Sequence, residues 1–294
     1  MESMAFLYSF GAELKGVWRM SEIHKEVIRQ LRTIEAEEDV RILYACESGS
    51  RAWGFPSKDS DYDVRFLYLR RPEAYLSIFA PRDVIERPIS DLLDINGWDL
   101  QKGLTLFRKS NPPLLEWLQS GIRYEEKYTV AESIRRLSPL GFSPKSCIYH
   151  YLHMAQGNYR TYLQGSEVRI KKYFYVLRPL LACAWIEKYN EVPPLEFSVL
   201  VEELIPEGTL LRETVKNLLI RKMSGDELNL EPRLEVINTY LEGQIAHFEE
   251  AAARFGPGGG IADKVLDELF RSALVEVWGE ESLWTAGLSR TRDN

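Results

Sequence analysis

Two aspartates, Asp61 and Asp63, stand one residue apart at the start of an apolar segment, and their spacing suits a divalent-cation site. Residues 62–69 are rich in β-branched and aromatic side chains with period-two alternation, which predicts a β-strand. Side chains at positions i and i+2 of a strand point to the same face, so both carboxylates would converge on one point. Because hard divalent ions are coordinated through oxygen, the pair predicts a Mg²⁺ site.

A glycine-serine turn precedes the two aspartates. Gly49 and Ser50 follow an apolar run, residues 41–45, that predicts a second buried strand. Glycine lets a ligand approach the main chain, Ser50 and the amides after it can donate hydrogen bonds to phosphate oxygens, and Arg51 adds a positive charge. Phosphoryl transfer needs mainly positioning, metal ions and donors on the outer phosphates. The turn and the acids together therefore predict a nucleotidyl-transfer site.

The conjunction of these elements carries the prediction, because each alone is common. A solvated polar loop over residues 57–61 is the simpler explanation of the polar residues. Asp63, however, lies inside an apolar strand, where an unpaired carboxylate is costly to bury. A buried acid is usually paired or bound to a metal, which favours the catalytic interpretation.

These residues resemble the DNA polymerase beta-like nucleotidyltransferases, whose signature is a Gly-Ser turn followed by a strand with alternating aspartates. The match extends over residues 47–55, 60–65, 97–100 and 109–112, which resemble the predicted nucleotidyltransferase group described as RNA-ligase-associated. The resemblance covers most of the chain and is strongest over residues 41–120. It implies an α+β fold, with a small mixed-sheet catalytic domain that has helices on one side of the sheet and is followed by an all-helical domain.

The resemblance also implies a third acid on a neighbouring strand, which acts on the attacking hydroxyl and completes the metal shell. The candidates are Asp91, Asp94 and Asp99. Asp94 is favoured because residues 92–95 read as a strand with one acid between apolar residues, pairing in a hairpin with residues 84–86. Asp99 opens an amphipathic helix whose first turn stabilises an acid, and Asp91 lies in a hairpin turn, where aspartate is common.

A basic, tyrosine-rich segment lies in the second half of the chain. Between residues 145 and 188 there are seven Lys or Arg and two acidic residues, interleaved with tyrosines. Basic groups mixed with aromatic rings suit phosphate contact and base stacking. The same pattern suits tyrosines packed in a helical core with charges on the surface, and the sequence leaves both interpretations open.

Within this segment residues 168–189 are predicted to form one helix. Lys171, Tyr175 and Arg178 would share a face of it, with Lys172 beside them. Related nucleotidyltransferases use such a helix to place a lysine, a tyrosine and an arginine over the triphosphate. The nucleotide-binding residues that this resemblance and the turn predict are Gly49, Ser50, Arg51, Lys171, Lys172, Tyr175 and Arg178.

Length and composition fit an enzyme with two domains. The 294 residues suffice for a catalytic domain over residues 1–125 and a helical substrate- and nucleotide-binding domain over residues 126–294, which ends in a helix over residues 263–278. The net charge of −7 argues against a protein that coats nucleic acid by bulk electrostatics. Residues 1–16 show no periodicity, and no function is assigned to them.

The chain shows no feature of a membrane or secreted protein. No apolar run approaches the length of a membrane span, and no signal core is present, so we expect no membrane partner and a cytoplasmic location. Cys46, Cys147 and Cys183 are far apart without metal-ligand spacing, which predicts reduced thiols in the core.

The sequence as a whole predicts a Mg²⁺-dependent nucleotidyltransferase, with Mn²⁺ as an alternative ion, that moves a nucleoside monophosphate from an NTP to a hydroxyl and releases pyrophosphate. Asp61, Asp63 and Asp94 are the predicted catalytic residues and metal ligands. We expect an RNA 3′ end as the acceptor, with a protein side chain or a small hydroxylated molecule as alternatives, and the resemblance implies a functional association with an RNA ligase. A non-catalytic nucleotide or RNA sensor is the contrasting class, but carboxylates that repel one another without metal disfavour it.

Overall fold

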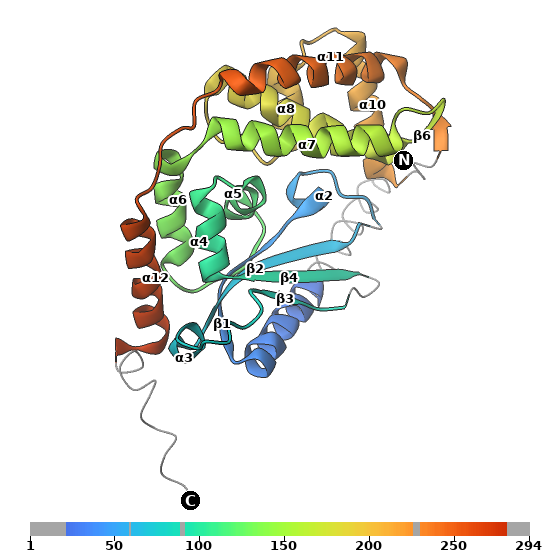
Figure 1. The fold of residues 1–294 in the computed structure, drawn as a ribbon. Helices are drawn as coiled ribbons and strands as arrows, with labels where there is room; N and C mark the ends of the chain where they lie inside the picture. Colours follow the sequence, from blue (N-terminus) through green and yellow to red (C-terminus); the bar gives the residue numbers. More distant parts are fainter. Residues whose placement is uncertain (1–21, 59, 89–91, 226–229, 281–294) are drawn as a thin grey trace, which may run out of the picture.

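The computed structural model describes residues 22–58, 60–88, 92–225 and 230–280. The chain forms two layers, a mixed β-sheet with its flanking helices and a layer of helices above it (Figure 1). This arrangement confirms the expected α+β class, with a mixed sheet followed by a helical portion. The boundary at residue 125 stays a prediction.

Five strands form the mixed sheet in the order β3-β4-β2-β1-β5. They are β1 (Val40–Glu47), β2 (Tyr62–Arg70), β3 (Val84–Glu86), β4 (Leu93–Asp99) and β5 (Arg123–Glu126). Strands β2 and β4 are parallel, whereas the other neighbours are antiparallel. The parallel register sets Asp63 directly beside Asp94, and the predicted hairpin of β3 with β4 is confirmed.

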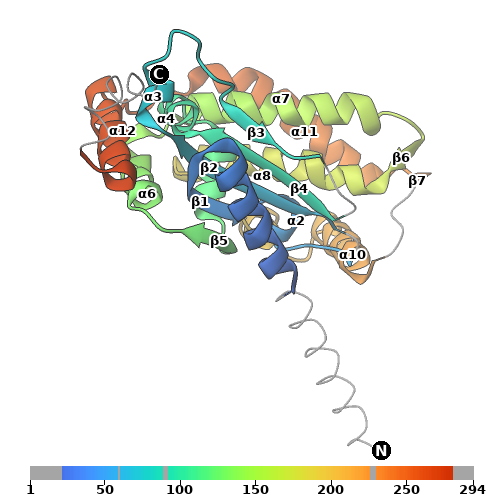
Figure 2. The same cartoon turned by 90° about the horizontal axis from the view of Figure 1, so that it is seen from below.

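Helices cover both faces of this sheet (Figure 2). A helix over residues 22–38 packs Val27, Leu31 and Ile34 against one face. The opposite face is covered by α4 (Leu100–Arg108), α5 (Pro112–Gln119) and α6 (Val130–Gly141). The expectation of helices on one side was therefore wrong. The central strands are apolar on both faces, and each face needs a cover.

Side chains at the helix starts explain where the helices of the sheet layer begin. The Asp99 carboxylate accepts a hydrogen bond from the Gln101 amide at 2.8 Å and caps α4, as the sequence predicted. The Asn111 side chain does the same for α5, where proline occupies the first helical turn. Two short helices, α2 (Gly49–Ala52) and α3 (Pro72–Tyr75), follow β1 and β2.

The upper layer is built mainly from helices. They are α7 (Pro144–Tyr162), α8 (Phe174–Tyr189), α9 (Phe197–Leu204), α10 (Leu210–Ser224) and α11 (Glu235–Ala251), followed by the 3₁₀ turn η2 (Ala252–Arg254). The single helix expected over residues 168–189 is wrong in its first part. That part forms β6 (Glu167–Arg169), which pairs with β7 (Leu230–Pro232), and then the 3₁₀ turn η1 (Ile170–Tyr173). The hydrogen bonds between β6 and β7 pair the backbone N–H and C=O groups that would otherwise be paired within a helix.

The last described helix, α12 (Asp263–Trp278), returns to the sheet layer and packs against α4 and α6 (Figure 1). Its bounds match the sequence prediction. The chain thus connects the two layers twice, and the two connections pack against each other. A Cβ added at Gly258 would lie 2.2 Å from the Phe142 carbonyl oxygen, and one at Gly259 would lie 2.1 Å from the Leu140 carbonyl oxygen.

Two further expectations concern membranes and cysteines. Within the described ranges, no helix is long and apolar enough to cross a membrane. Cys46, Cys147 and Cys183 are buried and free, which confirms the prediction of core thiols. Burial raises the pKa of Cys46 and of Cys147 to about 12, so both remain protonated.

An aromatic cluster joins the two layers. Phe55, which follows α2, stacks on Phe174 of α8 with ring centroids 4.9 Å apart and meets Phe197 of α9 edge-on at 5.4 Å. The Phe197 amide also donates a hydrogen bond to the Trp53 carbonyl at 3.0 Å. The loop after α2 is therefore anchored in the helical layer.

Replacing Phe55 with alanine should lower the free energy of unfolding by about 3 kcal/mol or more, because the ring is 2% exposed and its removal leaves a cavity. Urea denaturation followed by circular dichroism measures this change. The matched control is Phe79→Ala. That ring is 81% exposed, so its loss should change stability by less than about 0.5 kcal/mol. Equal losses in both variants would contradict the role assigned to Phe55.

Candidate active site

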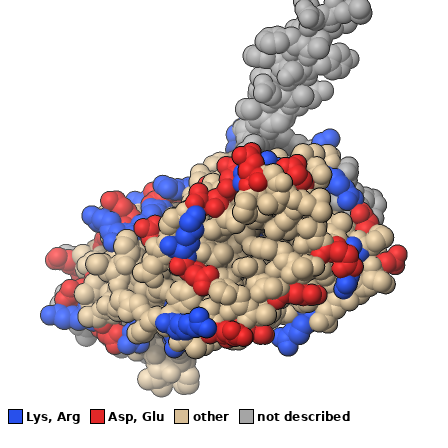
Figure 3. All heavy atoms as spheres, turned by 90° about the horizontal axis from the view of Figure 1, so that it is seen from above, with Lys and Arg blue, Asp and Glu red and all other residues tan. Residues whose placement is uncertain are grey.

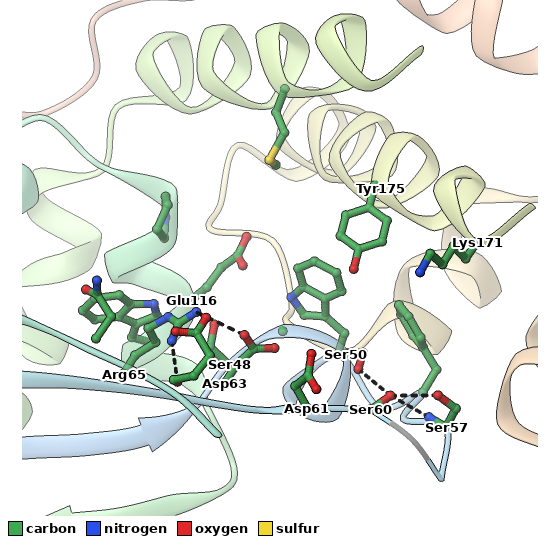
Figure 4. A pocket seen from close by; sticks show the side chains of 18 of the residues that line it. Ser48, Ser50, Ser57, Ser60, Asp61, Asp63, Arg65, Glu116, Lys171 and Tyr175 are labelled. Atoms are coloured by element: carbon green, nitrogen blue, oxygen red, sulfur yellow. Dashed lines mark hydrogen bonds and ion pairs between the residues drawn. The ribbon is translucent and has the colours of Figure 1, made fainter. Parts of the chain in front are cut away.

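A pocket of about 1380 Å³ opens between the sheet and the helical layer (Figure 4). Its floor comes from the turn after β1, from β2 and from β4. Its walls and roof come from α5, α7, α8 and α10. Both layers contribute polar and aromatic side chains to it, so its shape depends on how the layers meet.

The three predicted acids lie on the floor of this pocket. Asp61 directly precedes β2, Asp63 is in β2, and Asp94 is its register partner in β4. Figure 4 shows the Asp61 and Asp63 carboxylates directed into the pocket. The structure therefore brings together the three side chains that the sequence singled out.

Arg65 holds two of these acids together. Its guanidinium donates to Asp63 Oδ1 at 3.1 Å and to Asp94 Oδ2 at 2.7 Å, and it also bonds the Asp94 carbonyl oxygen. Sequence reasoning missed this residue, although its position two residues after Asp63 on the same strand face was a usable signal. The arginine offsets the repulsion between carboxylates on adjacent strands.

The Asp63 carboxyl has a raised pKa. Burial raises its pKa, Arg65 opposes this, and the neighbouring Asp94 and Asp61 charges raise the pKa further. Tyr175 of α8 lines the same pocket, and its pKa is raised mainly by burial and also by these acids. A site that raises carboxyl pKa values in this way favours the arrival of a cation.

Gly49 provides the space that the Asp63 carboxylate occupies. It has a left-handed backbone with φ of 59°, and an added Cβ would lie 2.0 Å from Asp63 Oδ2. The amide of Ser48 donates to the Asp63 carbonyl oxygen at 2.8 Å and ties the turn to the strand. Glycine is required here for a specific contact as well as for its conformational freedom.

A group of serine hydroxyls extends the turn. Ser50 Oγ lies 3.2 Å from Ser60 Oγ, which lies 3.0 Å from Ser57 Oγ, and all three residues line the pocket. Lys222 of α10 reaches down from the helical layer and donates to Ser57 Oγ at 3.2 Å. The sequence prediction included Ser50 but missed Ser57 and Ser60 as site residues. It also missed Lys222, because this lysine comes from a helix that is distant in the sequence.

Arg51 is placed differently from the expectation. Its guanidinium donates to the carbonyl oxygens of Asp61 at 3.1 Å and Ser60 at 2.7 Å, and it lies 3.6 Å from the centre of the Tyr62 ring. It is not among the residues that line the pocket. In this arrangement Arg51 fastens the loop that carries the acids.

Besides Arg65, three cations among the described residues line the pocket: Arg169, Lys171 and Lys222. Figure 4 places Lys171 on the same side as Ser57, away from Arg65. The pKa of Lys222 is lowered by burial and, to a smaller extent, by Lys171. Lys172 lies outside the lining and packs over the Tyr162 and Tyr175 rings. This end of the pocket is therefore suited to a polyanion.

Arg178 is buried instead of lining the cleft, which corrects the sequence prediction. Its side chain is 1% exposed, donates to Glu116 Oε1 at 2.8 Å and lies over the Trp53 ring. Tyr151 donates to the same Glu116 oxygen at 2.8 Å. The helix begins only at Phe174, and α5 supplies a partly buried counter-charge, Glu116, that the sequence pattern did not reveal.

The other candidates for the third acid differ from Asp94. Asp99 is 4% exposed, caps α4 and accepts a hydrogen bond from the Tyr75 hydroxyl at 2.8 Å. It is a structural residue outside the pocket lining. Asp91 lies outside the described residues. Asp94 is the candidate that faces the other two acids.

A fourth acid, Glu47, supports the site from below and was missed by the sequence analysis. It is fully buried at the end of β1, where it accepts hydrogen bonds from the Asp63 amide at 2.8 Å and from the Tyr124 hydroxyl. Burial raises the pKa of Glu47 to about 7, with a smaller contribution from the Asp63 charge. The signal available in the sequence was an acid between an apolar run and the Gly-Ser turn.

The carboxylates of the pocket form an incomplete donor set for a divalent ion. Over the described part of the chain, no group of three or more His, Cys, Asp or Glu side chains is arranged to enclose a metal, and Asp94 is bound by Arg65. Mg²⁺ is commonly held by one or two carboxylates together with substrate phosphates. Asp61 and Asp63 beside the open Gly49 turn fit an ion that arrives with a nucleotide.

Comparisons with known proteins agree with this geometry. A family model described as RlaP, the RNA repair pathway DNA polymerase beta family, matches residues 23–272. The chain belongs to the RlaP family. It is 52% identical over 254 residues to the uncharacterized protein YcgL of Bacillus subtilis, which covers 86% of this chain and 97% of that protein.

A solved structure is also similar. It is a nucleotidyltransferase-like protein from Exiguobacterium sibiricum, with 15% identity, a TM-score of 0.28, and coverage of 90% of this chain and 81% of that one. RlaP membership makes this protein a nucleotidyltransferase of the polymerase beta type in an RNA repair pathway, which confirms the resemblance and the enzyme class. Polymerase beta-like nucleotidyltransferases generally use divalent metals.

Gly49→Ala should reduce turnover by about a hundredfold or more, because the new Cβ would displace the Asp63 carboxylate. Gly54→Ala is the matched control. Gly54 also has a positive φ, 86°, but its Cβ would meet nothing within 4 Å. Steady-state kinetics and thermal unfolding should show similar destabilisation in both variants and loss of activity only in the first. Equal loss of activity would attribute the effect to backbone strain.

The free energy of unfolding should fall as the pH rises from about 4.5 to about 7. The pKa of Glu47 rises from its ordinary value of 4.5 to about 7, so the folded state holds this proton more tightly than the unfolded state does. The resulting stabilisation is complete below 4.5 and is lost as the pH rises through the folded-state pKa. In metal-free buffer, Glu47→Gln should remove about 3 kcal/mol of this fall, as measured by urea titrations. An unchanged pH profile would exclude Glu47 as its source.

Proposed function

We propose that this enzyme transfers a nucleoside monophosphate from an NTP to the 3′-terminal hydroxyl of an RNA and releases pyrophosphate. The observation that carries the proposal is the convergence of Asp61, Asp63 and Asp94 beside the Gly49–Ser50 turn, in a pocket with cations at one end. This arrangement supplies carboxylates at the reacting phosphorus and donors for the outer phosphates.

The triphosphate would lie toward the cationic end. The hydroxyls of Ser50, Ser57 and Ser60 face the pocket there, and Lys171 and Lys222 supply positive charge from the helical layer. Tyr175 lies beside the acids with its ring edge-on to Trp53 at 6.0 Å, where a nucleoside could pack. A nucleotide that contacts both layers would be oriented by both.

The chemical step follows from this placement. The acceptor oxygen forms a bond to the α-phosphorus, the bond to the bridging oxygen of pyrophosphate breaks, and the proton of the acceptor hydroxyl passes to a carboxylate, for which Asp94 is placed. Asp61 and Asp63 would hold Mg²⁺ or Mn²⁺, which stabilises negative charge on the phosphates when bound. Arg65 keeps Asp94 and Asp63 oriented on adjacent strands.

The RNA acceptor is supported by the family description, which places the family in RNA repair, and an association with an RNA ligase is part of the same proposal. The basic segment itself supports it less than the sequence suggested. Tyr151, Tyr159 and Tyr173 are buried in the core. Seen from above, the helical layer shows Lys and Arg interspersed with Asp and Glu, not one basic surface (Figure 3). RNA recognition is therefore expected inside the pocket.

The deciding experiment is transfer from each α-³²P-labelled NTP, with Mg²⁺ or Mn²⁺, onto small RNAs that include tRNA. The intact protein should label RNA and reveal the preferred base. Asp61→Asn and Asp63→Asn should each lower the rate by at least about a hundredfold, since even partners of metal ligands typically contribute tenfold to a hundredfold.

Lys264→Ala is the control for this experiment, because Lys264 projects into solvent from α12 and should leave the rate unchanged. Label on a protein or small molecule in cell extract, with none on RNA, would refute the RNA acceptor and retain the catalytic assignment. A protein that binds NTP but labels nothing in extract would instead support the sensor function.

A further inference from the structure

The pocket continues past the carboxylates, away from its cationic end. The sheet order places β4 on the side of β2 opposite to β1, so residues of β4 lie across Asp63 from the Gly49 turn. This part of the pocket, which we name the acceptor arm, is lined by Asn96, Trp98, Pro113, Trp117, His150 and Met154. Its floor is β4, and α5 and α7 form its wall and roof.

One face of β4 forms a row of three different groups. Asp94, Asn96 and Trp98 alternate with buried residues and all line the pocket. Along a strand, alternate residues are about 7 Å apart, so Trp98 lies about 13 Å from Asp94. A ribose hydroxyl held at Asp94 would therefore place its ribose near Asn96 and its base toward Trp98.

Packing against Trp117 fixes the Trp98 ring in a position where a base could stack on it. Its ring packs against Trp117 with centroids 3.9 Å apart and an angle of 35° between the planes. Trp117 is 4% exposed, and its carbonyl accepts a hydrogen bond from the Tyr44 hydroxyl at 2.6 Å, so it forms a fixed backing. Trp98 itself is only partly buried and keeps access to the pocket. Stacking on such a ring tolerates any base.

Around the acceptor arm, the charges of the described residues are balanced by partners. Arg65 is bound by Asp63 and Asp94, and Glu116 by Arg178. Burial lowers the pKa of His150, which keeps its imidazole neutral at pH 7. Glu86, at the edge of the arm, is paired with Arg82 and accepts from Asn96. The arm thus offers a neutral, aromatic surface, in contrast to the three cations at the other end.

We infer that the acceptor arm binds the 3′-terminal nucleoside of an RNA whose last ribose carries free hydroxyls, with its base stacked on Trp98, and that it disfavours ends carrying a terminal phosphate. The inference rests on the proposed function and names the kind of RNA end that the site accepts. A phosphate there would find no unpaired cation among the described residues that line the arm, because Arg65 is already bound by Asp63 and Asp94. A reaction that hydrolyses terminal phosphates would have to supply this substrate.

The test measures binding without nucleotide, so that it is independent of whether an end can react. Two 5′-labelled oligoribonucleotides, identical except for a terminal diol or a 3′-phosphate, are titrated with the intact protein by fluorescence anisotropy. The diol end should bind about tenfold more tightly. Trp98→Ala should weaken binding of the diol end by about tenfold, as expected for loss of one base-stacking contact, and Trp98→Phe should restore most of it.

Kinetics provide a second readout that a general structural defect would not reproduce. Trp98→Ala should raise the KM for RNA by about tenfold and leave the KM for NTP within about twofold, whereas Lys171→Ala should do the reverse. Trp185→Phe is the matched control, because this tryptophan packs on Tyr189 outside the pocket and should change neither constant.

The outcomes separate this inference from the function on which it rests. Equal binding of the two ends, or an unchanged KM for RNA in Trp98→Ala, would overturn the acceptor arm while RNA labelling by the intact enzyme upholds the proposed function. If the intact protein neither binds nor labels RNA under any condition, both proposals fail together.

Discussion

Repulsion among carboxylates is the constraint around which the sheet layer is organised. Asp63 and Asp94 sit side by side on parallel strands, and each would destabilise the other without a nearby positive charge. Arg65 supplies that charge within the protein, and Gly49 leaves the space into which one carboxylate fits. Glu47 adds a further acid under the same strand, where burial favours its protonated form. The site is thus assembled at an energetic cost that a bound cation would relieve.

The pocket exists only because two layers are held at a fixed distance. Glu116 of the sheet layer and Arg178 of the helical layer form an ion pair in which the arginine is buried, and Phe55 inserts between α8 and α9. A buried charge left without its partner is costly, so the ion pair specifies how the layers meet. In this arrangement of the layers, Lys222 of the helical layer donates a hydrogen bond to Ser57 of the sheet layer. Arg178 therefore contributes to the pocket indirectly, because its ion pair helps to fix the position of the helical layer that carries Lys222.

The sequence predicted the parts of this molecule that are encoded locally. Strand periodicity placed Asp61 and Asp63, and turn chemistry singled out Gly49, because neighbouring residues determine those features. Arg178 was misplaced, since its burial depends on an acid in another layer that no local pattern reveals. Lys222 was missed for the same reason, as its helix meets the turn only in the folded chain. The prediction of helices on one side of the sheet failed, because the sequence did not reveal that the central strands are buried on both faces.

The paired connections between the layers have a consequence for tolerance to mutation. Gly258 and Gly259 lie against carbonyl oxygens of Leu140 and Phe142, with no room for a β-carbon. A larger residue at either position would wedge the two crossing segments apart and tilt one layer against the other. The width of the pocket would then change without any alteration of a residue that lines it. The absence of side chains at these two glycines, which lie outside the pocket, therefore helps to set the width of the active site.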